Sequence, residues 1–179
     1  MIVKYFLLSL LIPFVSCREY QAVETLDLES YMGKWYQVYE DNFDKTFQGN
    51  SKCATAEYNI ISSNNVSVHN EQLSNKNELE TIDGYAFYKD GESGGYLTVK
   101  LDGQVDAPYW VIELGPKSNN LYDYSIVSDN FKLSLFVLTR DVEKFYKYYN
   151  DDVLKSLQQF GFTSKLNKPI QMNQTDCTF

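Results

Sequence analysis

Hydrophobic and polar residues alternate in short segments along most of this chain. Leu97, Val99 and Leu101, for example, alternate with the polar residues Thr98 and Lys100. Segments of strand length lie at 35–40, 53–61, 66–72, 80–88, 96–101, 109–114, 122–128 and 133–139. Residues typical of turns, mainly Asn, Asp, Ser and Gly, separate them. Alternation with a period of two predicts strands, and eight strands in a meander predict an all-β fold, an up-and-down antiparallel β-barrel.

Small residues recur on the apolar faces of these segments. Ala54, Ala56, Gly84 and Ala86 are examples. Small side chains on the inner surface of a barrel leave room, so they predict a cavity instead of a packed interior. The alternative is that these residues face outward or mark corners of the barrel.

Near the C-terminus the apolar period changes to that of a helix. The residues with this spacing are Phe145, Tyr149, Val153, Leu157 and Phe160. Gly161 is placed to end the helix, while its start is left open between Asp141 and Asn150. A single C-terminal α-helix with one apolar stripe is expected to pack on the outside of the barrel. Residues 170–172 are expected to form a short extra strand.

The first 17 residues have the features of a secretory signal peptide. One Lys precedes an apolar run that is too short to span a bilayer and is interrupted by Pro13. Cleavage after Cys17 would place small residues before the cut, which predicts a mature domain of residues 18–179. We therefore expect a secreted, extracellular protein that is not transmembrane. The alternative is that Cys17 is kept as the lipidated N-terminus of a bacterial-type lipoprotein.

Composition narrows the range of functions. With 16 basic against 24 acidic residues, the net charge of −8 disfavours a nucleic-acid partner. The single histidine, His69, excludes a multi-histidine metal site, and its position out of phase with Val66 and Val68 places it toward solvent. We expect neither a metal site nor catalytic residues, and therefore no enzyme.

Two cysteines and two asparagines are candidates for the covalent modifications of secreted proteins, disulfide formation and N-glycosylation. Once residues 1–17 are removed, Cys53 and Cys177 remain, and an even pair in a secreted chain predicts one disulfide. Two free buried thiols are the alternative. Asn65 and Asn173 each begin an Asn-x-Ser/Thr triplet and are expected to be N-glycosylation sites.

A Gly-x-Trp triplet, Gly33 to Trp35, opens the first predicted strand, and Arg140 follows the last one. With eight strands and a late helix, this pattern resembles the lipocalins, and among them apolipoprotein D with its insect and bacterial relatives. Further residues that carry the resemblance are 52–53, 58, 70–73, 107–110, 122–124, 138–139 and 175–177. The resemblance runs from about Leu26 to Cys177.

The resemblance implies roles for several residues. Trp35, after Gly33, plugs the closed end of the lipocalin barrel, and Arg140 crosses its ring, a contact worth about 0.5–2 kcal/mol. The disulfide from the second strand to the tail maps onto Cys53 and Cys177. Apolipoprotein D has a second disulfide that is missing here, so the N-terminal leader is expected to be held less firmly than in that relative.

The implied function is the transport of a small hydrophobic molecule, namely a lipid, fatty acid, steroid, retinoid or bilin pigment. No cofactor is expected apart from a bilin or retinoid bound as the ligand. The residues expected to line the ligand site are Tyr58, Leu101, Tyr109, Val111, Phe136 and Leu138. Ordinary core packing is the alternative for each of them. Phe43 and Phe47 are candidates for the mouth of the barrel, where they could touch a lipid surface.

Other classes of function stay open. An enzymatic lipocalin, such as prostaglandin D synthase, needs a cysteine in the cavity, whereas both mature cysteines here are assigned to a disulfide. The alternative is a protein-interaction or antioxidant and stress-response module whose pocket ligand is incidental. A cell-surface receptor is a further candidate partner, and the protein is expected to be a monomer or a weak homo-oligomer.

Overall fold

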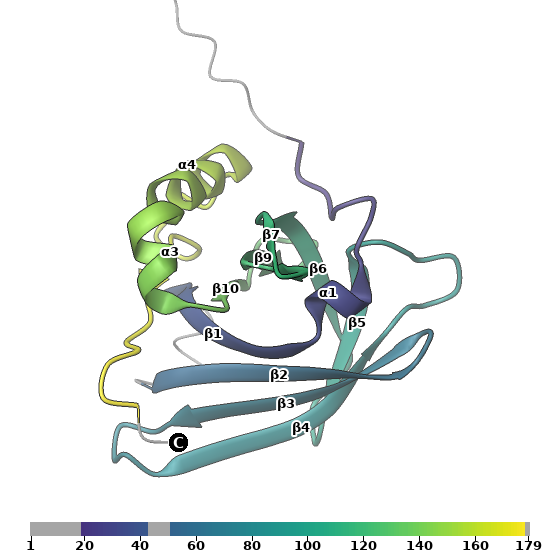
Figure 1. Ribbon diagram of the computed structural model, residues 1–179, viewed down its shortest axis with the longest axis horizontal. Helices are drawn as coiled ribbons and strands as arrows, with labels where there is room; N and C mark the ends of the chain where they lie inside the picture. The colour runs from purple at the N-terminus through teal and green to yellow at the C-terminus, as the bar shows by residue number, and fades with distance from the viewer. Residues whose placement is uncertain (1–18, 43–50, 178–179) are drawn as a thin grey trace, which may run out of the picture.

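The computed structural model describes residues 19–42 and 51–177 (Figure 1). Among these residues nine strands form one antiparallel sheet. In chain order, eight of them are β1 (Gly33–Glu40), β2 (Lys52–Ser62), β3 (Asn65–Leu73), β4 (Leu79–Phe87), β5 (Tyr96–Leu101), β6 (Ala107–Leu114), β9 (Tyr124–Ser128) and β10 (Leu135–Thr139). Each pairs with the next, and β10 pairs back onto β1, with Tyr36 opposite Thr139. The predicted eight-stranded barrel is therefore confirmed.

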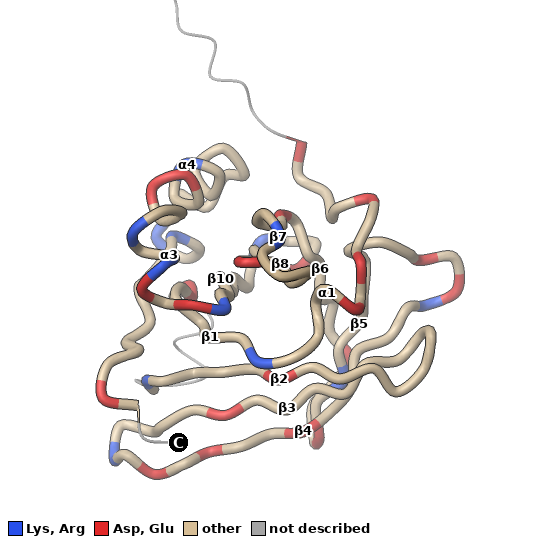
Figure 2. Tube along the Cα trace, in the orientation of Figure 1, with Lys and Arg blue, Asp and Glu red and all other residues tan. Residues whose placement is uncertain are grey.

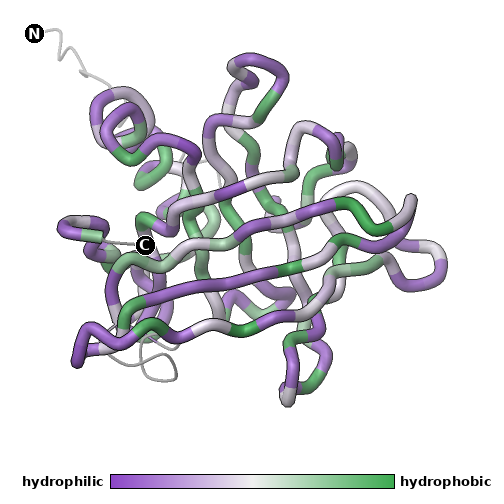
Figure 3. Tube along the Cα trace, turned by 60° about the horizontal axis from the view of Figure 1, so that its bottom comes forward, coloured by the Kyte–Doolittle hydropathy of each residue, from purple (hydrophilic) through white to green (hydrophobic). Residues whose placement is uncertain are grey.

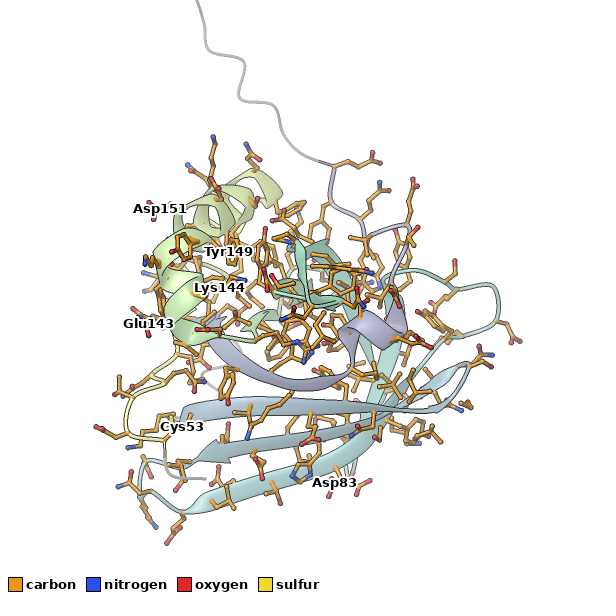
Figure 4. The ribbon with its side chains drawn as sticks, in the orientation of Figure 1. Cys53, Asp83, Glu143, Lys144, Tyr149 and Asp151 are labelled. Carbon is orange, nitrogen blue, oxygen red and sulfur yellow. A yellow bond between two sulfur atoms is a disulfide. The ribbon has the colours of Figure 1, made fainter. Side chains whose placement is uncertain are left out.

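The seventh predicted strand, 122–128, is interrupted at Asp123. Before this residue, β8 (Leu121–Tyr122) pairs with β7 (Lys117–Ser118) in a separate two-stranded sheet. Asp123 is buried, and its carboxylate accepts hydrogen bonds from Lys144 Nζ at 2.9 Å and Tyr149 Oη at 2.7 Å. Figure 4 shows these two residues on the helical segment beside the barrel. The break in the strand follows from these contacts, which connect residues distant in sequence.

The predicted C-terminal helix is present as two consecutive segments, α3 (Val142–Tyr148) and α4 (Asn150–Phe160). The side chain of Asp141 caps α3 by accepting a hydrogen bond from the Lys144 amide. Gly161 ends α4 with a φ of 90°, a left-handed conformation that glycine adopts without strain. The sequence left the start of the helix open between Asp141 and Asn150. One segment begins directly after Asp141, and the other begins at Asn150. Acidic and basic positions are interspersed along both segments (Figure 2).

Two apolar clusters lie on the two sides of the barrel wall. The outer one packs the helices against outward-facing side chains of β1, β6, β9 and β10. Its buried members are Val38, Tyr39, Ile112, Ile126, Leu135, Val137, Phe145, Val153, Leu157, Phe160 and Phe162. The inner one fills part of the barrel, and Figure 3 shows hydrophobic and hydrophilic positions following one another along the strands. A helix pairs with the barrel wall because both present one apolar face.

The leader before β1 lies across one end of the barrel. It contains a short helix, α1 (Leu28–Tyr31), capped by Asp27. Upstream, the Val23 amide donates to the Val111 carbonyl at 2.8 Å, and the Val23 carbonyl accepts from the Gly95 amide at 2.8 Å. We call this the closed end; the opposite end, where the turns 74–78, 102–106 and 129–134 lie, is the open end.

The tail returns to the outer side of the barrel beside β1 (Figure 1). There β11 (Ile170–Gln171) pairs with the end of β1, which confirms the predicted extra strand. Beyond it Cys177 forms a disulfide with Cys53 of β2, with Cα atoms 5.6 Å apart. The predicted pairing of these cysteines is confirmed, and the alternative of free thiols is wrong.

Some predictions fall outside the described residues. They concern the signal peptide 1–17 with Cys17, and the candidate mouth residues Phe43 and Phe47. In the described part of the chain, no helix combines the length and the apolar character that a membrane crossing requires.

Candidate functional site

Trp35 and Arg140 meet at the closed end of the barrel. Trp35 is fully buried, and the guanidinium carbon of Arg140 lies 3.7 Å from its ring centroid. The guanidinium also donates to the carbonyls of Met32 at 2.6 Å, Lys34 at 2.7 Å and Tyr31 at 2.9 Å. Burial lowers the pKa of Arg140 to about 10, so it stays charged at neutral pH. The structure thus brings together the pair that the sequence singled out.

Gly33 has a local reason to be glycine. Its φ is 90°, and a Cβ atom at this position would lie 3.4 Å from Nη1 of Arg140. A side chain would strain the backbone at this positive φ, directly beside the guanidinium that crosses the Trp35 ring. The Gly-x-Trp triplet and Arg140 therefore form one unit in space.

Three tyrosines share a buried hydrogen-bond network above this floor. The hydroxyl of Tyr109 lies 2.8 Å from that of Tyr31 and 3.0 Å from that of Tyr58, and Tyr31 also bonds Ser125 at 3.1 Å. Burial raises the pKa of Tyr31 to about 12 and raises those of Tyr58 and Tyr109 as well. The three phenols are therefore neutral at physiological pH, and their polar atoms are bonded to one another.

The space beside these tyrosines is almost full. A cavity of about 10 Å³ remains, which is roughly the volume accessible to one water molecule. Its lining residues are Leu26, Leu28, Tyr31, Met32, Tyr58, Val66, Ala86, Leu97 and Tyr109. The closed end is consequently a packed floor.

All six predicted lining residues belong to the inner cluster. Tyr58, Val111 and Leu138 are its buried members, while Leu101, Tyr109 and Phe136 are half-buried against it. Of the six, Tyr58 and Tyr109 border the small cavity at the floor. The structure thus places each of these side chains inside the barrel, at different depths.

The barrel is less filled toward the open end. Val99, Leu101 and Phe136 point inward and yet are only half-buried. The pairing of β4 with β5 covers only Gly84 to Phe87, so the first half of β4 has no neighbour in β5. Solvent therefore reaches the inner surface from this end, and a small apolar molecule could reach it by the same route.

The predicted small residues have two different roles. Ala56 and Ala86 are members of the inner cluster, as a cavity lining would require. Gly84 instead permits close contact between β4 and β5, because a Cβ atom there would lie 2.2 Å from the carbonyl oxygen of Lys100. Its small size is explained by strand packing.

Sequence reasoning missed two inward-facing amides. Gln37 follows Trp35 at a spacing of two and stands opposite Leu138, while Asn70 stands opposite Ala56. Nε2 of Gln37 and Oδ1 of Asn70 are buried and have no hydrogen-bond partner among the described residues. The period of two could have revealed both, because Asn70 also follows the inward-facing Val68 at that spacing.

His69 lies on the outer face of β3, as predicted. Its Nδ1 is 2.6 Å from Asp83 Oδ1, a residue labelled in Figure 4, and its Nε2 is 3.3 Å from Glu71 Oε1. The hydrogen bond to Asp83 is the main reason why the pKa of His69 is raised. Within residues 19–42 and 51–177, no group of three or more His, Cys, Asp or Glu side chains is arranged to hold a metal ion.

The two predicted glycosylation sites lie near opposite ends of the barrel. Asn173 is exposed in the tail, and its Oδ1 accepts hydrogen bonds from the amide and the hydroxyl of Thr175. Asn65 is half-buried at the start of β3.

Comparisons with known proteins agree on one family. The model of the Lipocalin-like domain matches residues 26–171. The outer membrane lipoprotein Blc of Vibrio cholerae is 33% identical over 119 residues, which are 66% of this chain and 67% of that protein. Apolipoprotein D of Oryctolagus cuniculus is 28% identical over 90 residues, 50% of this chain and 46% of that protein. Among solved structures, apocrustacyanin C1 has a TM-score of 0.61 at 17% identity, covering 84% of this chain and 81% of its own.

Proposed function

This chain belongs to the lipocalin family, and on that premise we propose that it is a secreted carrier of a small hydrophobic molecule. Proteins of the family bind small hydrophobic ligands. One observation carries the proposal for this chain: the barrel is packed at its closed end, while Val99, Leu101 and Phe136 inside it stay half-buried toward the open end. An apolar ligand entering there would remove these side chains from water, which stabilises the complex by about 25 cal/mol per Å² of apolar surface buried.

The chemistry of the inner surface suits neutral, mainly apolar ligands. Aromatic and branched side chains dominate the inner cluster, and they bury large areas at a small cost in conformational entropy. The candidate ligands are a lipid, a fatty acid, a steroid, a retinoid or a bilin pigment. A bound bilin or retinoid would be cargo, and the proposal includes no catalytic step.

Ligand titration tests the carrier role. The mature protein is titrated with retinol, palmitate, progesterone and biliverdin while Trp and Tyr fluorescence is recorded, and complexes are weighed by native mass spectrometry. We expect at least one of these ligands to bind with one-to-one stoichiometry. Failure of all four to bind would contradict the carrier proposal.

A pair of variants locates the ligand. Leu101→Trp adds a bulky ring inside the barrel, whereas Lys100→Trp adds the same ring to the outer face of the same strand. We expect the first change to weaken binding at least tenfold and the second to leave it within twofold. Equal affinity of the two variants would place the ligand outside the barrel.

Secretion has its own test. The proposal includes removal of residues 1–17, so intact mass and N-terminal sequencing of protein expressed in a secreting host should begin at Arg18. A chain that begins at Cys17 with the mass of attached acyl groups would instead support the lipoprotein alternative.

The proposal assigns no thiol chemistry to the described residues. Both Cys53 and Cys177 are engaged in the disulfide, so neither is a free nucleophile or a free reducing thiol. A protein-interaction or antioxidant module whose pocket ligand is incidental stays the alternative proposal, and an antioxidant role would have to use groups other than these two thiols.

A further inference from the structure

The inner surface of the barrel differs from one side to the other. On β5, β6, β9 and β10 most inward side chains are apolar, among them Leu97, Val99, Leu101, Val111, Phe136 and Leu138, while the inward hydroxyl of Ser125 is bonded to Tyr31 at the floor. On β1, β2 and β3, in the half of the barrel nearer the open end, amides stand among alanines. This polar strip consists of Gln37, Ala54, Ala56 and Asn70. A ligand in the barrel would meet apolar groups on one side and hydrogen-bonding groups on the other.

The strip has the geometry of a subsite. Gln37 stands on β1 and Asn70 on β3, and between them Ala54 and Ala56 of β2 leave space. Gln37 is only 7% exposed, so solvent hardly reaches its amide. Nε2 of Gln37 and Oδ1 of Asn70 do not bond each other, and neither bonds any other described group.

Unbonded buried amides are costly in the ligand-free protein. A buried donor or acceptor without a partner destabilises a folded protein by about 1–3 kcal/mol. At the floor of the same barrel, three tyrosine hydroxyls bond one another. Nε2 of Gln37 and Oδ1 of Asn70 have no such partner among the described residues, so a ligand group that accepts from the first or donates to the second would satisfy it.

The charges around the strip disfavour an anionic group. Arg140 lies below it, and its two terminal nitrogens already donate to the backbone carbonyls of residues 30, 31, 32 and 34. Glu40, at the end of β1 nearer the open end, is 3% exposed. A carboxylate on the ligand would therefore be desolvated near an existing acid, and among residues 19–42 and 51–177 no hydrogen bond places a second cation against Gln37 or Asn70, so burying a hydroxyl is more favourable.

We propose that Gln37 and Asn70 form a neutral polar subsite inside the barrel, which selects apolar ligands carrying a hydroxyl group over the corresponding carboxylates. The apolar part of the ligand packs against the opposite side of the barrel, and its hydroxyl donates to the Asn70 oxygen and accepts from the Gln37 amide. This inference rests on the proposed carrier function and narrows its ligand class.

Two matched pairs of ligands test the subsite: retinol against retinoate, and hexadecanol against palmitate, all at pH 7.5. In each pair that binds, we expect the alcohol to bind at least tenfold more tightly than the acid. Gln37→Met and Asn70→Leu should each weaken alcohol binding at least fivefold and leave acid binding within twofold. Gln158→Met, the same kind of change on the exposed face of α4, serves as the control and should alter neither.

A second readout separates binding from folding. Gln37→Met replaces an unbonded buried amide by an apolar group of similar size, so the ligand-free variant should melt at a higher temperature than the wild type. A lower melting temperature with unchanged selectivity would mean that Gln37 is structural, and it would overturn the proposal. Equal binding of alcohol and acid by the wild type would overturn the subsite alone. No binding of any of the four would also overturn the subsite, and it would overturn the carrier function as well if progesterone and biliverdin fail to bind too.

Discussion

The two ends of the barrel treat buried polar groups differently. At the closed end, Arg140 donates to backbone carbonyls, and the hydroxyls of Tyr31, Tyr58 and Tyr109 bond one another. Within this network the Nε atom of Arg140 is buried without a partner. Toward the open end, Nε2 of Gln37 and Oδ1 of Asn70 are buried without partners in the described chain.

Polar groups at the closed end contribute to the stability of the fold, while those toward the open end are the ones that we propose bind a ligand. Hydrogen bonds completed within the protein contribute to folding, while a buried group left unbonded costs free energy until a ligand or water satisfies it. The closed end therefore serves as a stable floor. The open half is where we propose that the ligand binds, and its walls are held from outside by the tail, which is attached covalently through Cys177.

The largest expected effect comes from releasing the tail. The disulfide joins residues 124 positions apart, and Cys53→Ser with Cys177→Ser should lower the free energy of unfolding by about 2–5 kcal/mol. Urea denaturation measures this loss. Hydrogen exchange should accelerate at the Met172 amide, which bonds Val38, more than at the Arg140 amide near the closed end. Uniform acceleration at both ends would contradict the view that the tail holds the open half.

Removing the cation of the closed end comes next. Arg140→Ala removes one donor from each of the carbonyls of Tyr31, Met32 and Lys34 and should cost about 2–4 kcal/mol of stability. Arg140→Lys keeps the charge but not the planar fork, so it should recover only part of this loss. The melting temperature should fall more than ligand affinity does, and the reverse result would remove the distinction between floor and binding site.

Breaking the tyrosine network should have a smaller effect. Tyr109→Phe removes the hydroxyl that links Tyr31 to Tyr58 and should lower the free energy of unfolding by about 1–2 kcal/mol. Tyr85→Phe is the matched control, because Tyr85 is 40% exposed on the outer face of β4 and should change stability by less than about 0.5 kcal/mol. Similar losses in both variants would show that the network adds nothing to the floor.

Alkaline titration probes the same floor without mutation. The folded pKa of Tyr31 is about 12, above the ordinary value of 10.0, so its contribution to stability is complete below pH 10. The contribution is lost as the pH rises through 12, and we expect a loss of about 1 kcal/mol between pH 10 and 11. Tyrosinate absorbance at 295 nm, recorded with circular dichroism, should show Tyr31 ionising after the exposed tyrosines, and Tyr58 and Tyr109, whose pKa values are raised further, ionising later still or only on unfolding. Early ionisation of Tyr31 in the folded protein would contradict its burial.

The smallest expected effect lies on the outer wall. His69→Asn removes the contacts with Asp83 and Glu71, but the histidine side chain is 40% exposed, so the loss should stay below about 0.5 kcal/mol. Because the folded pKa is raised, this contribution is present below the ordinary histidine pKa of 6.5 and disappears as the pH rises through the folded value. Titration of the ring protons by NMR, with and without added salt, measures both quantities.

Local patterns were enough to predict most of the fold. The segment 96–101 coincides with β5, and Gly161 ends the last helix as predicted. The alternation of apolar and polar residues in a strand and the capping of a helix depend on neighbours in sequence, so both can be recognised from the sequence alone. The interruption at Asp123 could not be read in this way, because the Lys144 and Tyr149 groups that hold it come from a helical segment some twenty residues later.

The candidate site was predicted in part for the same reason. Tyr58 and Tyr109 were correctly placed inside the barrel, but nothing local to either one reveals that their hydroxyls meet. Gln37 and Asn70 stand at inward positions that the alternation indicates, yet a polar residue inside an apolar pattern does not by itself show that it lacks a partner.

By itself, the sequence determined the eight strands, the late helix, the cysteine pair and the Gly-x-Trp signature that places the chain in its family. These features depend on spacing along the chain. Only the tertiary structure decided that one end of the barrel is filled by mutually bonded tyrosines while buried amides remain unbonded toward the other. Whether a buried polar atom has a partner depends on groups far apart in sequence, which come together only when the barrel closes.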